Sequence, residues 1–143
     1  MDSSSIALEQ AKSKGLSVIQ TNFDDLSNVP AADVILFLEV LEHVPNSEEL
    51  LEWSTRHAQR VVVFSVPNTG FFAHRLRLLI GRFPLQWRLN PSEHLRFWTA
   101  KDMKWWLKQL GIGRPHLHIY EGPWGLRRIW PTLFGQGLFV YIP

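Results

Sequence analysis

The chain has 143 residues, of which 45% are apolar and 20% are charged, and its net charge is +2. This composition is typical of one ordinary globular domain, and the small charge gives no reason to expect nucleic acid as a partner. A disulfide framework and a zinc–thiolate site are excluded because the chain contains no cysteine, and no window approaches the ~20 uninterrupted apolar residues of a membrane span. Residues 1–5 show no secretory signal, which predicts a cytoplasmic location.

The first part of the chain predicts a helix followed by two strands. Residues 3–5 are serines that can cap a helix over residues 6–14, and Gly15 ends it. Leu16–Gln20 alternates apolar and polar residues, as a strand with one covered face does. Val34–Leu38 is apolar throughout, which is typical of a strand buried on both faces of a sheet.

The middle of the chain predicts further alternation of helices and strands. Asn46, with Glu49 three residues later, predicts a helix start. Residues 61–66 form a second apolar strand that Pro67 and Asn68 end. Residues 71–80 have the spacing of an amphipathic helix, and residues 81–91 predict a loop.

The last part predicts one helix and two strands. Thr99 and Asp102 form a capping box for a helix that Gly111 closes. Two strands follow at residues 117–120 and 138–142. The residues between them are rich in glycine and proline and predict a linker.

This order of elements predicts the α/β fold class, with a mostly parallel sheet and helices on both faces, in a single domain of residues 1–143. The uncharged strands 34–38 and 61–66 are expected to be adjacent, parallel and central. Ligands bind outside the carboxyl ends of such strands. The groups that follow the first three strands are Asn22 with Phe23, Glu39, and Pro67 with Asn68.

Residues 33–45, which end in the string EVLEHVP, resemble the fourth strand and following turn of class I S-adenosylmethionine-dependent methyltransferases. The strings PNTGFFAHRLRLLIGRFP, HLRFWTAKDMKWWLKQLG and IWPTLFGQGLFVYIP are similar to the MetW group, named for methionine biosynthesis. The two glutamates of EVLEH are more similar to the ubiquinone-pathway O-methyltransferases. The resemblance implies a Rossmann-like fold, S-adenosylmethionine as cofactor, and methyl transfer to an oxygen, nitrogen or carbon of a small molecule.

The glycine loop of that family has no counterpart in the expected place. Gly111 and Gly113 close a helix, and Gly135 and Gly137 precede a strand, so neither pair lies between a strand and a helix. The resemblance therefore implies a domain that lacks the first strand and its loop. A gene fragment, a shortened chain and a degenerate protein all agree with this reading. It leaves open whether the chain is an enzyme or a non-catalytic accessory protein, as the MetW group is thought to be in activating homoserine O-acetyltransferase.

The resemblance also implies five cofactor-binding residues. Asp2 falls where an acid binds the ribose hydroxyls, and Asn22 and Phe23 fall where the family contacts adenine. Leu38 and Glu39 would lie beside the cofactor at the end of their strand. The alternatives are a helix cap for Asp2, an ordinary turn for Asn22 and Phe23, and a core position for Leu38.

Glu39, Glu42 and His43 stand at positions i, i+3 and i+4, which share one face if the turn is helical. Two carboxylates and an imidazole can bind Mg²⁺ or Mn²⁺, with His94 as a fourth ligand. Alternatively, His43 or His94 is the catalytic base. Without an ion the two carboxylates would repel, so that one binds a proton more tightly or pairs with a cation such as Arg96.

Basic and aromatic residues alternate between Phe71 and Arg88. Such a segment can be a lid over the substrate, a protein-binding face or a membrane-surface helix, and the first two are favoured over the membrane. His74 within it is expected to be a surface or lid residue. An unpaired edge on strand 34–38 would favour a homo-oligomer.

Overall fold

The computed structural model describes residues 1–21, 23, 25–84 and 93–143. These residues form two compact units, Met1–Ala31 and Ala32–Pro143. No helix in this described part of the chain is long and apolar enough to cross a membrane.

The described residues of the unit Met1–Ala31 form one helix, α1 (Ser5–Ser13). The side chain of Ser4 caps it by accepting a hydrogen bond from the Ala7 amide at 3.4 Å, as the serine cluster predicts. The strand expected at residues 16–20 is wrong, since only Gln20 is paired, in a single parallel bridge with Asp2. A single bridge to Asp2 provides too few backbone hydrogen bonds to form a strand of five residues.

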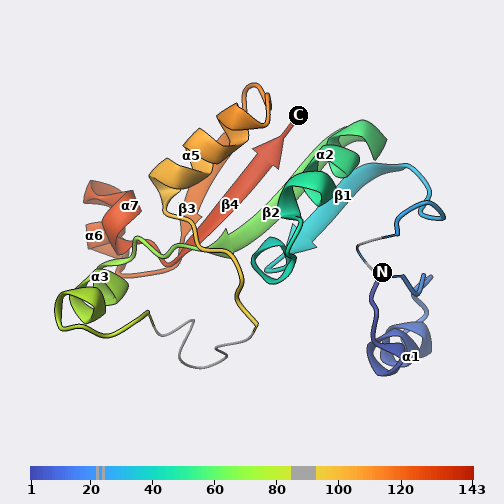
Figure 1. Cartoon of the computed structure of the whole chain (residues 1–143), viewed down its shortest axis with the longest axis horizontal. Helices are drawn as coiled ribbons and strands as arrows, with labels where there is room; N and C mark the ends of the chain where they lie inside the picture. The colour runs from blue at the N-terminus through green and yellow to red at the C-terminus, as the bar shows by residue number, and fades with distance from the viewer. Residues whose placement is uncertain (22, 24, 85–92) are drawn as a thin grey trace. The chain divides into compact units, whose positions relative to one another are not determined.

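The unit Ala32–Pro143 is built on a four-stranded sheet (Figure 1). Its order is β1-β2-β4-β3; β1 and β2 are parallel, and β4 is antiparallel to both of its neighbours. Three strands therefore run in one direction, as the α/β pattern predicts. The strands are β1 (Ala32–Leu38), β2 (Ala58–Pro67), β3 (His116–Tyr120) and β4 (Gly137–Ile142).

Short helices connect these strands. They are the 3₁₀ helix η1 (Leu41–His43), α2 (Ser47–His57), α3 (Phe72–Leu79), α5 (Ala100–Gln109), α6 (Trp124–Ile129) and α7 (Pro131–Phe134). The last two correct the prediction of a plain linker after β3. Pro123 precedes α6 and Pro131 begins α7, where the missing amide proton would have no partner in the helix anyway.

The core lies on one face of the sheet. The paired positions Phe37, Phe64 and Val140 are 0–3% exposed. On that face α2 packs against β2, and the Trp106 indole of α5 donates a hydrogen bond to Glu48 of α2 at 3.0 Å. The two helices therefore lie side by side (Figure 1) and shield the apolar face from water.

The parallel pairing of β1 and β2 is confirmed, and Glu39 and Asn68 follow their carboxyl ends at the same edge of the sheet. The central position expected for β1 is wrong, because β1 is the end strand of the described sheet. Burial on both faces is also wrong: Val34, Leu36 and Leu38 are 51–56% exposed. Successive side chains of a strand point to opposite faces, and only one face here lies against α2 and α5.

Candidate functional site

Glu39 lies at the carboxyl end of β1, where the polar residues of the candidate site gather. It follows β1 with a positive φ of 52°, which is uncommon for a residue other than glycine. Its amide donates a hydrogen bond to the Ser65 carbonyl at 3.1 Å. Its Oε1 accepts hydrogen bonds from Ser65 Oγ at 2.8 Å and from the Tyr120 hydroxyl at 3.0 Å. These contacts hold an unusual backbone conformation and orient one carboxylate at the carboxyl ends of the strands.

Ser65 and Tyr120 were not among the expected site residues. Each is a polar residue near the carboxyl end of an apolar strand, and this is the signal that could have identified it. Burial, as the main cause, together with the neighbouring Glu39 carboxylate raises the pKa of Tyr120 to about 12. The Tyr120 hydroxyl therefore stays a hydrogen-bond donor to Glu39 across the physiological range.

Glu42 is the most deeply buried acid of the site. It lies in η1 with 1% exposure, and neither carboxylate oxygen accepts a hydrogen bond from a described residue. Burial is the main cause that raises its pKa to about 7, and the nearby Glu39 carboxylate adds to it. Glu42 is therefore a carboxyl group that gains or loses its proton near neutral pH.

The two expected histidines lie beside Glu42. His43 Nδ1 is 2.9 Å from the Glu93 carbonyl, so Nδ1 donates this hydrogen bond and Nε2 is the ring nitrogen that does not take part in it. Nε2 of His43 is 3.8 Å from Glu42 Oε1. The ring of His94 meets the ring of His43 edge to face, with centroids 4.7 Å apart. Burial, and then the nearby His43, lower the pKa of His94, which favours a neutral imidazole.

Backbone hydrogen bonds bring His94 to this place. The amides of Leu95 and Arg96 both donate to the Glu42 carbonyl, at 2.8 and 3.1 Å. As a result, one ligand atom from each of Glu42, His43 and His94 lies within 4.8 Å of the others. Glu39 is not in this group of three. An acid and two imidazoles at this separation can share a proton or bind one cation.

Arg96 does not neutralise the acids of this edge. Its guanidinium donates to both oxygens of Glu48, at 2.9 and 3.1 Å. The pairing with Glu39 or Glu42 considered from the sequence is therefore wrong. A planar guanidinium can bind both oxygens of one carboxylate. Arg96 does so with Glu48 of α2 and is therefore not available to Glu39 or Glu42.

Asn68 supports the edge and does not face a ligand. It is fully buried, and its Nδ2 donates to the carbonyls of Thr132 at 3.2 Å and Gly135 at 2.8 Å. Its Oδ1 accepts from the Gly70 amide at 3.0 Å. His74, expected at the surface, is only 8% exposed because α3 turns its ring inward against Phe71. Both residues belong to the packing of the unit.

The cofactor residues expected from the sequence are spread over both units. Asp2 accepts a hydrogen bond from the Ser4 amide at 2.8 Å through Oδ1, and Phe23 is 37% exposed. Asn22 lies outside the described residues. In the other unit, Leu38 is 54% exposed directly before Glu39. The assignment of these residues to a cofactor stays a prediction.

Comparison with known proteins supports one family. A family model described as a methyltransferase domain matches residues 2–112. No curated protein matches the chain significantly.

Solved structures resemble the chain over nearly its whole length. An S-adenosylmethionine-dependent methyltransferase from Archaeoglobus fulgidus has 15% identity and a TM-score of 0.59, covering 94% of this chain and 79% of its own. A possible histamine N-methyltransferase from Thermotoga maritima has 12% identity and a TM-score of 0.69, with coverages of 97% and 69%. Magnesium protoporphyrin IX methyltransferase from Synechocystis, with bound S-adenosylhomocysteine, has 14% identity and a TM-score of 0.53, with coverages of 96% and 58%. The chain thus has the Rossmann-like α/β fold of class I methyltransferases, and it belongs to the methyltransferase domain family.

Proposed function

We propose that this chain takes part in methyl transfer from S-adenosylmethionine to an oxygen or nitrogen of a small molecule. The observation that carries the proposal is the convergence of Glu42, His43 and His94 at the carboxyl edge of the sheet. His43 Nδ1 donates to a carbonyl, and Nε2, 3.8 Å from Glu42 Oε1, is the nitrogen that can accept a proton, as a general base requires. Glu42, with a pKa of about 7, can stabilise the imidazolium that forms when His43 accepts a proton.

Residues at the end of β1 fit the cofactor. S-adenosylmethionine supplies a methyl group on a sulfonium, and it carries hydroxyl and ammonium donors beside an apolar adenine. Glu39 offers an oriented carboxylate that accepts hydrogen bonds, and Leu38 offers an exposed apolar surface next to it.

As the alternative to a general base at His43, whose Nε2 lone pair can serve only one of the two roles, we propose a divalent cation at the group formed by Glu42, His43 and His94. The buried Glu42 oxygens have no described partner, and the hydrogen bond at His43 Nδ1 leaves the other ring nitrogen available as a ligand. A cation there would supply Lewis-acid assistance by lowering the pKa of an acceptor hydroxyl. Two imidazoles with one carboxylate suit Mn²⁺ better than Mg²⁺, which prefers oxygen ligands. Glu39, engaged by Ser65 and Tyr120, would serve as an outer carboxylate.

The function is tested by calorimetric titration of the chain with S-adenosylhomocysteine. We expect micromolar binding by the wild type and by His43→Ala, because His43 faces the acceptor. Turnover of S-adenosylmethionine with a panel of phenols and amines should fall about 10²- to 10⁴-fold in His43→Ala, the usual contribution of a general base. His57→Ala is the matched control, because His57 lies on α2 with its ring stacked on Trp53. Absence of cofactor binding, or equal losses in both variants, contradicts the proposal.

The accessory role is the second candidate. It is favoured by the exposed apolar residues at the end of α3, where Leu79 is 82% and Ile80 is 72% exposed. A protein that activates homoserine O-acetyltransferase through this surface would give no signal with S-adenosylhomocysteine. Replacing Leu79 by lysine would then abolish the activation while leaving the fold intact.

A homo-oligomer is a further prediction from the exposed face of β1. Leu36 lies in the middle of that face with 56% exposure, on the end strand of the described sheet. We expect sedimentation velocity to show concentration-dependent association that Leu36→Lys reduces. Leu79→Lys on α3 is the control and should leave the association unchanged. A monomer at all concentrations argues against this interface.

A further inference from the structure

A second site lies away from Glu39, on the other face of the sheet. Successive side chains of β3 point to opposite faces of the sheet. Tyr120 contacts Glu39 on one face, so Leu117 and Ile119 lie on the other. On that side a cavity of about 460 Å³ opens between α5, β3 and the helices α6 and α7. We call it the basic pocket. Its lining is Ala100, Lys101, Lys104, Leu117, His118, Ile119, Arg127, Arg128, Pro131 and Thr132.

The charge of the basic pocket is of one sign. Lys101 and Lys104 come from α5 and Arg127 and Arg128 from α6, and none of the lining residues that the structure describes is an acid. None of these four cations has an ion-pair partner among the described residues. Asp102, the acid of α5, accepts a hydrogen bond from the Thr99 hydroxyl at 2.7 Å and does not line the pocket. Four cations in one lining, without an ion-pair partner in the described part of the chain, favour an anionic ligand.

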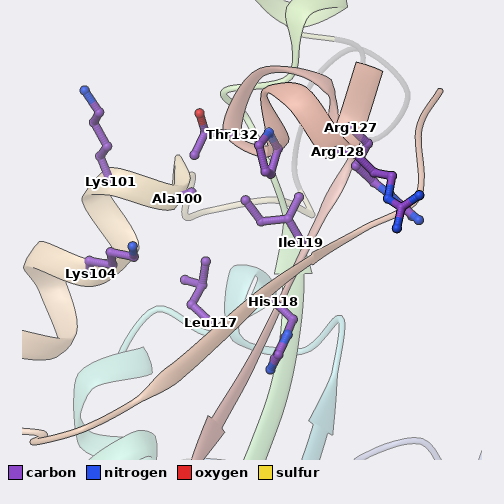
Figure 2. A pocket seen from close by; sticks show the side chains of 10 residues that line it. Ala100, Lys101, Lys104, Leu117, His118, Ile119, Arg127, Arg128 and Thr132 are labelled. Atoms are coloured by element: carbon purple, nitrogen blue, oxygen red, sulfur yellow. The ribbon is translucent and has the colours of Figure 1, made fainter. Parts of the chain in front are cut away.

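The shape of the pocket adds to this. Figure 2 shows Leu117 and Ile119 as an apolar floor with Lys104 on one side and the two arginines on the other. Ala100, the first residue of the ten-residue α5, contributes to the lining. The Thr132 hydroxyl supplies a further donor group. Arg128 lies over the Trp124 ring at 4.7 Å, which limits the freedom of its guanidinium.

We propose that the basic pocket binds a ligand in which a phosphate or diphosphate group is joined to an apolar portion. The anionic group would contact Lys104 and Arg127, and the apolar portion would cover Leu117 and Ile119. The same phosphate chemistry occurs in a soluble phosphorylated metabolite and in a phospholipid head group. Trp124 and Ile129, exposed at 68% and 81%, lie on α6, the helix that carries Arg127 and Arg128.

Calorimetric titration with inorganic pyrophosphate tests the anionic part. We expect one saturable site whose affinity falls at least about tenfold in Lys104→Gln/Arg127→Gln, the effect of losing charge-assisted hydrogen bonds. Lys108→Gln is the matched control, because Lys108 is an exposed lysine of α5 outside the pocket, and it should keep wild-type affinity. No saturable binding, or an equal loss in the control, overturns the proposal.

Two further titrations distinguish the sources of the ligand and test the apolar floor. Hexyl phosphate should bind the wild type more tightly than inorganic phosphate does, and equal affinities overturn the role of Leu117 and Ile119. Binding to phosphatidylcholine vesicles only when they contain phosphatidic acid, with loss in the double variant, supports a lipid. Binding of hexyl phosphate without binding to those vesicles supports a soluble ligand.

Discussion

Glu42→Gln is expected to stabilise the protein above pH 7 when a chelator removes divalent cations. The folded protein holds the Glu42 proton more tightly than the unfolded chain does, since burial raises the pKa from 4.5 to about 7. The contribution of Glu42 to the free energy of unfolding is therefore fully present below pH 4.5 and is lost as the pH rises through about 7. The loss between pH 4.5 and pH 8 amounts to about 3 kcal/mol in the free energy of unfolding. Glutamine stays neutral and removes this dependence.

Urea unfolding from pH 5 to pH 8 measures the effect. The exposed Glu49 of α2 is the control position, and Glu49→Gln should follow the wild-type curve at every pH. Glu42→Gln should be less stable than, or equal to, the wild type at pH 5 and more stable at pH 8. If the two proteins lose stability in parallel as the pH rises, Glu42 does not carry the raised pKa.

The second large effect is expected from a divalent cation. Mn²⁺ binding at Glu42, His43 and His94 should raise the melting temperature of the wild type at pH 8. At a concentration one hundred times the Kd, the stabilisation is about 2.7 kcal/mol, which corresponds to roughly 8 °C for a domain of this size. The shift should shrink below pH 7, because protons compete with the cation for Glu42 and the histidines.

Variants identify the ligands. His94→Ala and Glu42→Gln should each abolish most of the Mn²⁺ shift, whereas His57→Ala, outside the group, should retain it. Mg²⁺ should give a smaller shift than Mn²⁺ because two of the three ligands are imidazoles. A wild type whose melting temperature does not respond to either ion has no cation site, and Glu42, His43 and His94 then act through proton transfer alone.

Local patterns predicted the helices α1, α2, α3 and α5 but missed α6 and α7. Ser4 caps α1, and Thr99 accepts a hydrogen bond from the Asp102 amide at the start of α5, as the capping signals indicated. These interactions join residues at most three positions apart, so the sequence contains the whole of their geometry. The prediction of a strand at residues 16–20 was wrong for the opposite reason. The alternating pattern is local, but a strand forms only when its backbone pairs with another segment of the chain.

The sequence alone determined the parallel β1–β2 pair, the turn that carries Glu39, Glu42 and His43, and membership of a methyltransferase family. It determined them because apolar strands and the EVLEHVP string are contiguous features. Only the tertiary structure decided which distant groups meet them. Hydrogen bonds from the 95–96 backbone to the Glu42 carbonyl place His94, and the register of β3 on β4 brings Tyr120 to Glu39. The basic pocket likewise exists only because folding places α6 beside α5. Such contacts depend on packing between segments that are far apart in the chain, which no local pattern encodes.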